Sequence, residues 1–193
     1  MRFTQSLIAL SLILVSLTAH AVNLHVVMKT NLGDITLELY PEKAPKTVEN
    51  FLKYVEDGFY KNTVFHRVIA NFMIQGGGFD SSLKQKPTRS PIENEAGNGL
   101  TNQVGTIAMA RTSDPHSATA QFFINIANNT FLNFTAPNQN GYGYAVFGKV
   151  TGGMEIINKI AGTPTGAGGP FSGDVPKNSI VIEDIVLLPI TTK

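Results

Sequence analysis

Apolar and polar residues alternate strictly near the start of the folded part of this chain. Residues 24–30 and 34–40 are rich in apolar and β-branched side chains, and the second run alternates at Ile35, Leu37 and Leu39. A short Asn-Leu-Gly segment separates the two runs. Because a period of two is typical of a strand with one buried face, the pattern predicts an opening β-hairpin.

Two other segments have the spacing of amphipathic helices. One begins near Pro45 and ends at Gly58, and the other covers residues 153–161, with apolar side chains three and four positions apart in both. Proline at a first helical position and glycine just past the last turn are recognised start and stop signals. We therefore expect two helices, each with one apolar face packed on a sheet.

Short apolar runs account for most of the remaining chain. Strands are predicted near residues 65–69, 72–75, 105–110, 121–126, 144–150 and 179–188, with a turn-rich stretch at 76–102 and a glycine-rich loop at 162–176. Many short strands with only two helices favour a mainly β fold, a closed antiparallel barrel whose ends the helices cover, because closure removes exposed sheet edges. A β-sandwich gives similar signals and stays open as an alternative.

The first 21 residues have the features of a cleaved signal peptide. Arg2 gives a basic start, residues 7–17 are apolar, and Ala19 to Ala21 form a small-x-small cleavage site. The alternative is a membrane anchor, but the apolar run is shorter than the ~20 residues that span a bilayer. We expect cleavage to leave residues 22–193 as a single domain, with no membrane span.

Composition narrows the classes of function. The predicted signal peptide contains one basic residue, so 14 basic and 14 acidic residues remain, and this balance favours neither nucleic acid nor an anionic membrane as a partner. The chain has no cysteine, which excludes disulfides and thiol chemistry. Its four histidines show no paired ligand spacing. We therefore expect no metal and no cofactor.

Residues 65–77 carry the candidate chemistry, because a cation and an amide lie among soft apolar groups that suit a proline. Read with a period of two, the expected faces are Phe65 with Arg67 and Ile69, Phe72 with Ile74, and Met73 with Gln75. Standing alone, Arg67 would be an exposed sheet residue in a surface ion pair. His66 faces away from Arg67 in this interpretation and is expected to make a structural hydrogen bond.

This segment resembles the signature of the cyclophilin family of peptidyl-prolyl cis/trans isomerases. Residues 105–111 (GTIAMAR) and 120–125 (AQFFIN) match the family's second motif in order and spacing, and residues 144–150 resemble its last active-site strand. The resemblance covers residues 25–188. It implies a closed eight-stranded barrel with two helices.

The resemblance also implies a set of site residues. Arg67 and Gln75 match the catalytic arginine and the glutamine that helps to hold it and the substrate carbonyl. Residues expected to contact the substrate are Phe72, Met73, Ala110, Arg111, Gln121, Phe123, Phe131, Leu132 and Tyr144. At Ala110 and Arg111 the contact would come from the backbone. Periodicity alone leaves ordinary barrel core as the alternative for Phe72, Met73, Phe123 and Leu132.

Three positions depart from the eukaryotic pattern. Phe131 stands where a tryptophan is common, Tyr144 where a histidine is common, and Arg111 where an asparagine is common. Losing the indole N–H removes a donor that holds cyclosporin, so we expect weak cyclosporin binding. The first two changes are associated with exported bacterial members, which favours the periplasm.

The sequence thus predicts a monomeric isomerase that assists folding by rotating Xaa-Pro bonds in unfolded or flexible exported polypeptides. No bond breaks in this reaction, so it needs no nucleophile or cofactor. The alternative is a module or chaperone that binds proline-containing segments, with turnover secondary. An intact Arg67 and Gln75 favour turnover, because simple binding would not need a donor for the transition state.

Overall fold

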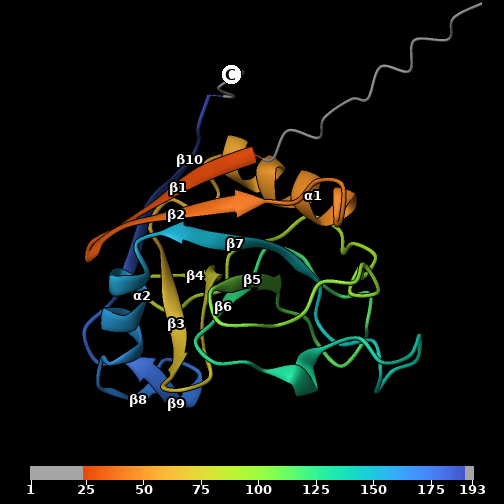
Figure 1. Ribbon diagram of the computed structural model, residues 1–193. Helices are drawn as coiled ribbons and strands as arrows, with labels where there is room; N and C mark the ends of the chain where they lie inside the picture. The colour runs from red at the N-terminus through yellow and green to blue at the C-terminus, as the bar shows by residue number, and fades with distance from the viewer. Residues whose placement is uncertain (1–23, 190–193) are drawn as a thin grey trace, which may run out of the picture.

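The chain folds as a closed antiparallel β-barrel, described here by a computed structural model that covers residues 24–189. The predicted signal peptide lies outside the described residues. The strands close in the order β1-β10-β3-β4-β6-β5-β7-β2 (Figure 1). They are β1 (Leu24–Thr30), β2 (Gly33–Leu39), β3 (Thr63–Ile69), β4 (Met73–Asp80), β5 (Thr106–Met109), β6 (Phe122–Asn125), β7 (Val146–Gly152) and β10 (Val181–Leu187). The predicted barrel is confirmed, and the sandwich alternative is wrong.

The barrel interior is a packed apolar core rather than a channel. The alternation that predicted the opening hairpin is observed, since Ile35, Leu37 and Leu39 are all fully buried. Every barrel strand contributes to the same cluster, with Val26, Ile35, Phe65, Ile74, Ile107, Phe122, Phe147 and Ile182 among its members. Because one face of each strand fills the interior, the other face of each strand forms the outer wall.

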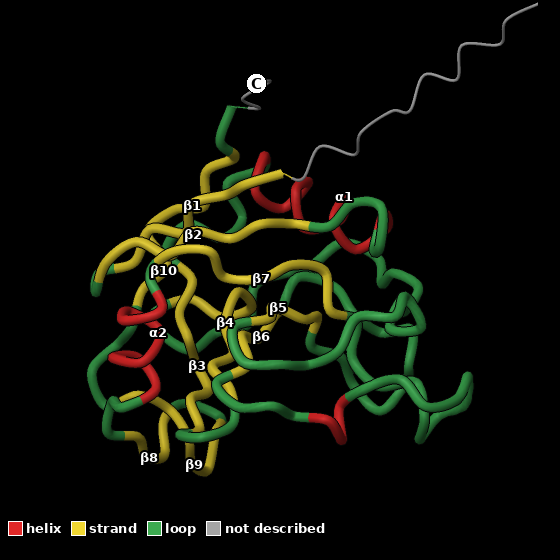
Figure 2. The backbone as a smooth tube through the Cα atoms, in the orientation of Figure 1, coloured by secondary structure: helices red, strands yellow, loops and turns green. Residues whose placement is uncertain are grey.

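Two helices complete this core, as the spacing predicts. They are α1 (Pro45–Glu56) and α2 (Met154–Ala161), which lie on separate sides of the barrel (Figures 1 and 2). Phe51 of α1 contacts the rings of Tyr60, Phe122 and Phe147 at centroid distances of 5.3 to 5.9 Å. Ile157 and Ile160 of α2 are fully buried in the same cluster. Among the residues that the structure describes, no helix is both long and apolar enough to cross a membrane.

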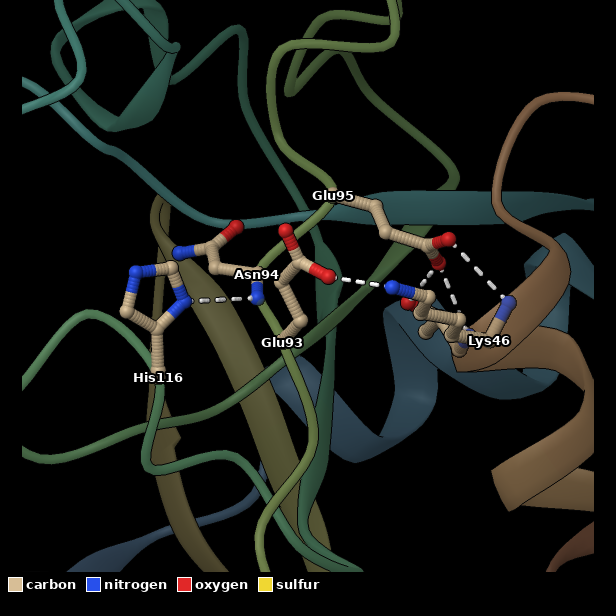
Figure 3. A network of polar contacts seen from close by, with 6 residues as sticks. Lys46, Glu93, Asn94, Glu95 and His116 are labelled. Atoms are coloured by element: carbon tan, nitrogen blue, oxygen red, sulfur yellow. Dashed lines mark hydrogen bonds and ion pairs between the residues drawn. The ribbon is translucent and has the colours of Figure 1, made fainter.

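A carboxylate from a distant loop caps helix α1. Ala44 precedes the helix and has no side chain that can cap it. Glu95 instead accepts hydrogen bonds from the backbone N–H groups of Lys46 and Thr47, at 3.1 and 2.8 Å (Figure 3). A negative charge at this end also complements the helix dipole. In the same network His116 Nδ1 accepts the backbone N–H of Asn94 at 3.1 Å, so the capping loop is also tied to a second loop.

Two glycine-rich segments expected to be irregular are strands instead. Residues 76–78 continue β4, and the crowding explains why glycine stands there: a Cβ added at Gly78 would lie 2.3 Å from Gln121 Cγ. Close approach, rather than a turn, thus accounts for this glycine. Within the predicted loop at 162–176, β8 (Thr165–Gly168) and β9 (Phe171–Pro176) pair as a separate two-stranded sheet. In both segments the high glycine content led to a wrong prediction of irregular structure.

A bulge in β3 changes which residues share a face. Phe65 pairs with Gly76, and Arg67 pairs with Gln75. Between these two pairs, β3 advances by two residues and β4 by only one. An extra residue on one strand reverses the alternation. Phe65 therefore joins the interior core while Arg67 lies half-exposed, and the prediction that they share a face is wrong. Phe72 and Ile74 are also separated, because Phe72 precedes β4 and belongs to a different cluster.

Candidate active site

The candidate residues form a row across the outer wall of the barrel. Arg67 on β3 lies opposite Gln75 on β4, and Gln75 lies opposite Phe123 on β6. Phe123 in turn lies opposite Ala108 on β5, which pairs with Val146 on β7. Side chains directly opposite on neighbouring strands have Cβ atoms about 4.5–5.5 Å apart. Strand register therefore places the cation and the amide next to an apolar surface.

A small pocket lies over this row. Its volume is about 120 Å³, and its lining consists of Arg67, Phe72, Met73, Gln75, Ala110, Arg111, Phe123, Leu132 and Tyr144. Every site residue predicted from the sequence is in this lining except Gln121 and Phe131. Gln121 lies next to the pocket, where its Oε1 accepts a hydrogen bond from Gln75 Nε2 at 3.0 Å. Phe131 is at the rim, with its ring stacked on that of Phe72.

The apolar wall of the pocket is separate from the barrel core. Met73 and Phe123 are buried, Ala108 and Val146 lie behind them, and Phe72 and Leu132 pack against this second cluster while remaining partly exposed. Because the cluster faces outward, these side chains are not part of the core that fills the interior. Ordinary barrel core was the alternative for them, and their packing separates them from the cluster that fills the interior. They present an apolar surface to whatever enters the pocket.

Arg67 forms a surface ion pair, as the alternative interpretation expected, with a partner that the sequence did not identify. Its Nε lies 3.5 Å from Oδ2 of Asp174, which comes from β9 in the segment expected to be a loop. The two side chains are 42% and 46% exposed, so solvent weakens the pair. The two residues are more than 100 positions apart in the chain. No local pattern in the sequence could have indicated this contact.

Arg111 is fixed beside Tyr144 on the other side of the pocket. Its Nε donates to the Gly143 carbonyl at 2.9 Å and its Nη1 to the Thr112 carbonyl at 2.8 Å. The guanidinium lies over the Tyr144 ring, 4.7 Å from the centroid. Tyr144 also meets the ring of Phe123 edge-on at 5.6 Å. The second arginine therefore supports the pocket wall with its side chain, a role beyond the expected backbone contact.

Comparisons with known proteins agree with this geometry. Residues 25–187 match the family model described as cyclophilin type peptidyl-prolyl cis-trans isomerase/CLD. The chain belongs to the cyclophilin family. It is 55% identical over 162 residues to peptidyl-prolyl cis-trans isomerase B of Escherichia coli, covering 84% of this chain and 98% of the relative. It is also 54% identical to a peptidyl-prolyl cis-trans isomerase of Acinetobacter baylyi, covering 91% and 92% of the two chains.

Solved cyclophilin structures have the same fold. The crystal structure of a Cryptosporidium parvum cyclophilin aligns with a TM-score of 0.72 at 30% identity, covering 86% of this chain and 98% of the other. A second structure of that protein, in the presence of the dipeptide Ala-Pro, aligns with a TM-score of 0.71. The present chain is therefore a peptidyl-prolyl cis-trans isomerase, as its sequence predicts, and it is similar to bacterial members.

Buried asparagines fix the backbone around the pocket of this cyclophilin. Asn129 Nδ2 donates to the Phe72 carbonyl at 2.9 Å and to Asn125 Oδ1 at 2.7 Å. Asn125 Nδ2 donates to Asn102 Oδ1 at 3.1 Å, and Asn102 Nδ2 donates to the Leu132 carbonyl at 3.2 Å. Buried amides are costly unless they are paired, so the network constrains both pocket residues. These asparagines were not predicted as site residues, because their hydrogen bonds join segments that only the folded chain brings together.

His66 of this cyclophilin is buried between two aromatic rings. Its ring centroid lies 4.5 Å from that of Phe79 and 5.4 Å from that of Phe171. Nδ1 has no hydrogen-bond partner, so the expected structural hydrogen bond is absent at this atom. Burial lowers the pKa of His66 to about 4, with a smaller contribution from the charge of Arg67, while the nearby Val64 backbone opposes the shift. His66 is therefore neutral at pH 7 and serves as a packing residue.

Proposed function

We propose that Arg67 is the electrostatic catalyst of Xaa-Pro rotation and that Gln75 helps to hold it and the substrate carbonyl. Rotation must overcome a barrier of ~18–20 kcal/mol, because the amide bond has partial double-bond character. As the amide twists, a lone pair becomes localised on the prolyl nitrogen. A donor aimed at that nitrogen stabilises the transition state more than the ground state, which is the condition for a faster rate.

The observation that carries this proposal is the position of Arg67 beside the apolar wall. The guanidinium lies at the edge of a pocket whose buried floor includes Met73 and Phe123. A prolyl ring in contact with these side chains would place its nitrogen near the cation. An apolar surrounding lowers the local dielectric and strengthens such a hydrogen bond. The Ala-Pro dipeptide present with the related Cryptosporidium cyclophilin supports a proline-containing ligand.

Arg67 would supply only part of the catalysis. Unaided rotation takes tens to hundreds of seconds, and acceleration by roughly 10⁴ to 10⁵ requires about 5.5–7 kcal/mol. A hydrogen bond from a charged donor contributes ~1.5–3 kcal/mol. The remainder would come from the apolar pocket and from fixed groups that hold the residues on either side of the bond. Gln75, itself hydrogen-bonded to Gln121, is the candidate for holding the carbonyl.

The decisive experiment measures the cis-to-trans rate of a short Xaa-Pro peptide with the purified protein and with Arg67→Ala. We expect kcat/KM to fall by roughly ten- to 150-fold, the factor that corresponds to one charged hydrogen bond. Arg89→Ala is a matched control, because Arg89 forms a comparably exposed pair with Asp57 outside the pocket. Equal activity of Arg67→Ala and Arg89→Ala would contradict the proposal.

The alternative role, binding of proline-containing segments as a chaperone, uses the same pocket. It requires affinity for a prolyl peptide but no dependence of function on turnover. Titration of the peptide into Arg67→Ala separates the two roles. If the variant keeps its affinity for the peptide and still assists refolding of a proline-limited test protein, binding rather than turnover is the function.

We further propose that the protein is an exported monomer that acts in the periplasm. Support comes from the basic start, apolar run and small-x-small site within residues 1–21. Proline isomerisation limits the folding of many proteins, so an isomerase in this compartment would speed the folding of other exported polypeptides. Expression of the whole chain in a Gram-negative host tests this: we expect a periplasmic product whose mass corresponds to a start at Val22. An uncleaved product in the cytoplasm would contradict it.

A further inference from the structure

The structure assigns a positioning role to Asp174: its carboxylate holds the guanidinium of Arg67 in place for the transition state. The inference rests on the proposed catalytic role of Arg67. The contact joins Asp174 Oδ2 to Nε of Arg67 at 3.5 Å. Because a guanidinium has five N–H donors, a carboxylate at Nε leaves the two terminal nitrogens for another acceptor. An arginine side chain otherwise has considerable rotamer freedom, which a fixed anion reduces.

The backbone around Asp174 is shaped to aim this side chain. Gly166 pairs with Val175, and Gly168 pairs with Phe171. Between these two pairs, β8 has one residue and β9 has three, which makes a bulge in β9. Asp174 lies in this bulge with a φ of +65°, a left-handed conformation that costs free energy for a residue with a side chain. Bulges of this kind re-aim side chains and are common next to active sites. The strained backbone therefore directs the carboxylate toward Arg67.

Aromatic contacts hold the bulged hairpin against the strand that carries Arg67. Phe171, at the start of β9, stacks on His66 at an interplanar angle of 28° and meets Phe79 edge-on at 5.0 Å. His66 directly precedes Arg67 on β3. Strands β3 and β9 are therefore in contact at two consecutive positions of β3, through the ring stacking at His66 and the ion pair at Arg67. Val175, which follows Asp174, is also buried. The carboxylate thus comes from an anchored strand rather than from a free loop.

Charge and placement favour a functional rather than a stabilising role for this pair. Exposed ion pairs contribute little to folding, so the pair does not account for the strained conformation. By contrast, a small loss of alignment at a catalytic donor lowers the rate directly. Among the described residues, Asp174 is the one carboxylate that forms an ion pair with Arg67. Removal of Asp174 should therefore affect turnover more than stability.

The test compares Asp174→Gly and Asp174→Asn with the parent protein. Glycine removes the side chain and tolerates the positive φ, so the backbone does not gain strain. We expect Asp174→Gly to lower kcat/KM about two- to fivefold, the change that corresponds to loss of an exposed ion pair, without lowering the melting temperature. Asparagine also tolerates this conformation and keeps an acceptor oxygen, so Asp174→Asn should recover part of the rate. Asp57→Asn, at the similarly exposed pair with Arg89, is the matched control and should keep full activity.

A double-variant measurement shows whether Asp174 acts through Arg67. In an Arg67→Ala background, Asp174→Gly should cause no further loss of kcat/KM. An equal loss in both backgrounds, or an unchanged rate for Asp174→Gly alone, would overturn the inference. If Arg67→Ala itself keeps full activity, both the catalytic role of Arg67 and this inference fail. If Arg67→Ala is impaired and Asp174→Gly is not, only the inference about Asp174 fails.

Discussion

Phe131 stacks on Phe72 at the rim of the pocket, with ring centroids 5.7 Å apart and an interplanar angle of 26°. Phe131 is nevertheless 73% exposed, which is unusual for a large aromatic side chain. An exposed ring held by one stacking contact extends the apolar wall beyond the pocket. A bound ligand that extends past Phe72 on this side of the pocket would contact Phe131.

The first prediction concerns cyclosporin, which we expect to bind weakly because Phe131 offers no N–H donor. Phe131→Trp supplies an indole N–H at the rim. It should tighten cyclosporin binding roughly two- to tenfold, which is the change in affinity expected from one neutral hydrogen bond. Calorimetric titration measures the change. Val186→Trp, another exposed position but on β10, is the matched control. Equal affinities of the two variants, or tight binding by the parent protein, would refute the prediction.

The second prediction tests the hydrogen bond between Gln75 and Gln121. A Cβ at Gly78 would lie 2.3 Å from Gln121 Cγ and 2.6 Å from Cδ, so Gly78→Ala must displace this side chain. Gln75 then loses its partner, and we expect kcat/KM to fall about two- to tenfold. Peptide isomerisation assays measure this loss.

Two further variants make the result specific. Gln121→Ala removes the same partner without a clash, so it should cause a similar loss, and the double variant should be no worse than Gly78→Ala. Gly162→Ala is the matched control, since its nearest new contact would be at 3.5 Å and its φ is helical. A normal rate for both Gly78→Ala and Gln121→Ala would show that the hydrogen bond has no part in turnover.

The third prediction is a pH dependence of stability that originates at His66. In the folded protein the pKa of His66 is about 4, below its ordinary value of 6.5. Between these pH values the unfolded chain binds a proton that the folded chain does not, so the free energy of unfolding rises with pH across this window. As pH falls from about 6.5 to about 4, we expect a loss of ~3 kcal/mol from this group.

Denaturant unfolding of the parent protein and of His66→Phe at several pH values measures this effect. Phenylalanine keeps a ring between Phe79 and Phe171 but does not titrate. The difference between the two proteins removes the contribution of all other titrating groups. Parallel pH profiles of the two proteins would show that His66 is not the source.

The fourth prediction concerns the carboxylate that caps α1. Glu95→Ala removes the acceptor for the backbone N–H groups of Lys46 and Thr47. Loss of a helix cap costs about 1 kcal/mol, which lowers the melting temperature by about 2–4 °C in a protein of this size. Glu93→Ala is the matched control, because Glu93 pairs with the exposed side chain of Lys46 and, among the described residues, accepts no backbone N–H of the helix. Scanning calorimetry should show a clearly larger shift for Glu95→Ala.

The fold was predictable wherever one face of an element is buried. Alternation at Ile35, Leu37 and Leu39 and the spacing on both helices reflect burial in the barrel, so local sequence carries the signal. Prediction from local sequence fails where a bulge or a close contact with a distant side chain determines the local structure. The bulge between Phe65 and Arg67 reverses the alternation, and Gly78 is a strand residue whose missing side chain leaves room for Gln121.

The pocket lining was predictable because its residues fall in a few short motifs on strands whose register brings them together. Arg67, Gln75 and Phe123 are aligned by strand pairing, and a resemblance between motifs could identify them. Asp174 and Asn129 differ, since Asp174 contacts Arg67 and Asn129 contacts the Phe72 carbonyl across distant segments of the chain. Such contacts depend on the finished fold, and no spacing in the sequence records them.

Because the pocket opens on the outer wall of a barrel whose interior is filled, a polypeptide need not pass through the protein to reach it. Neither end of the bound chain has to be free, so a proline in the middle of a long chain is as accessible as one near a terminus. The enzyme can therefore bind a proline directly from solution and release it again, and no chain end has to pass through the protein.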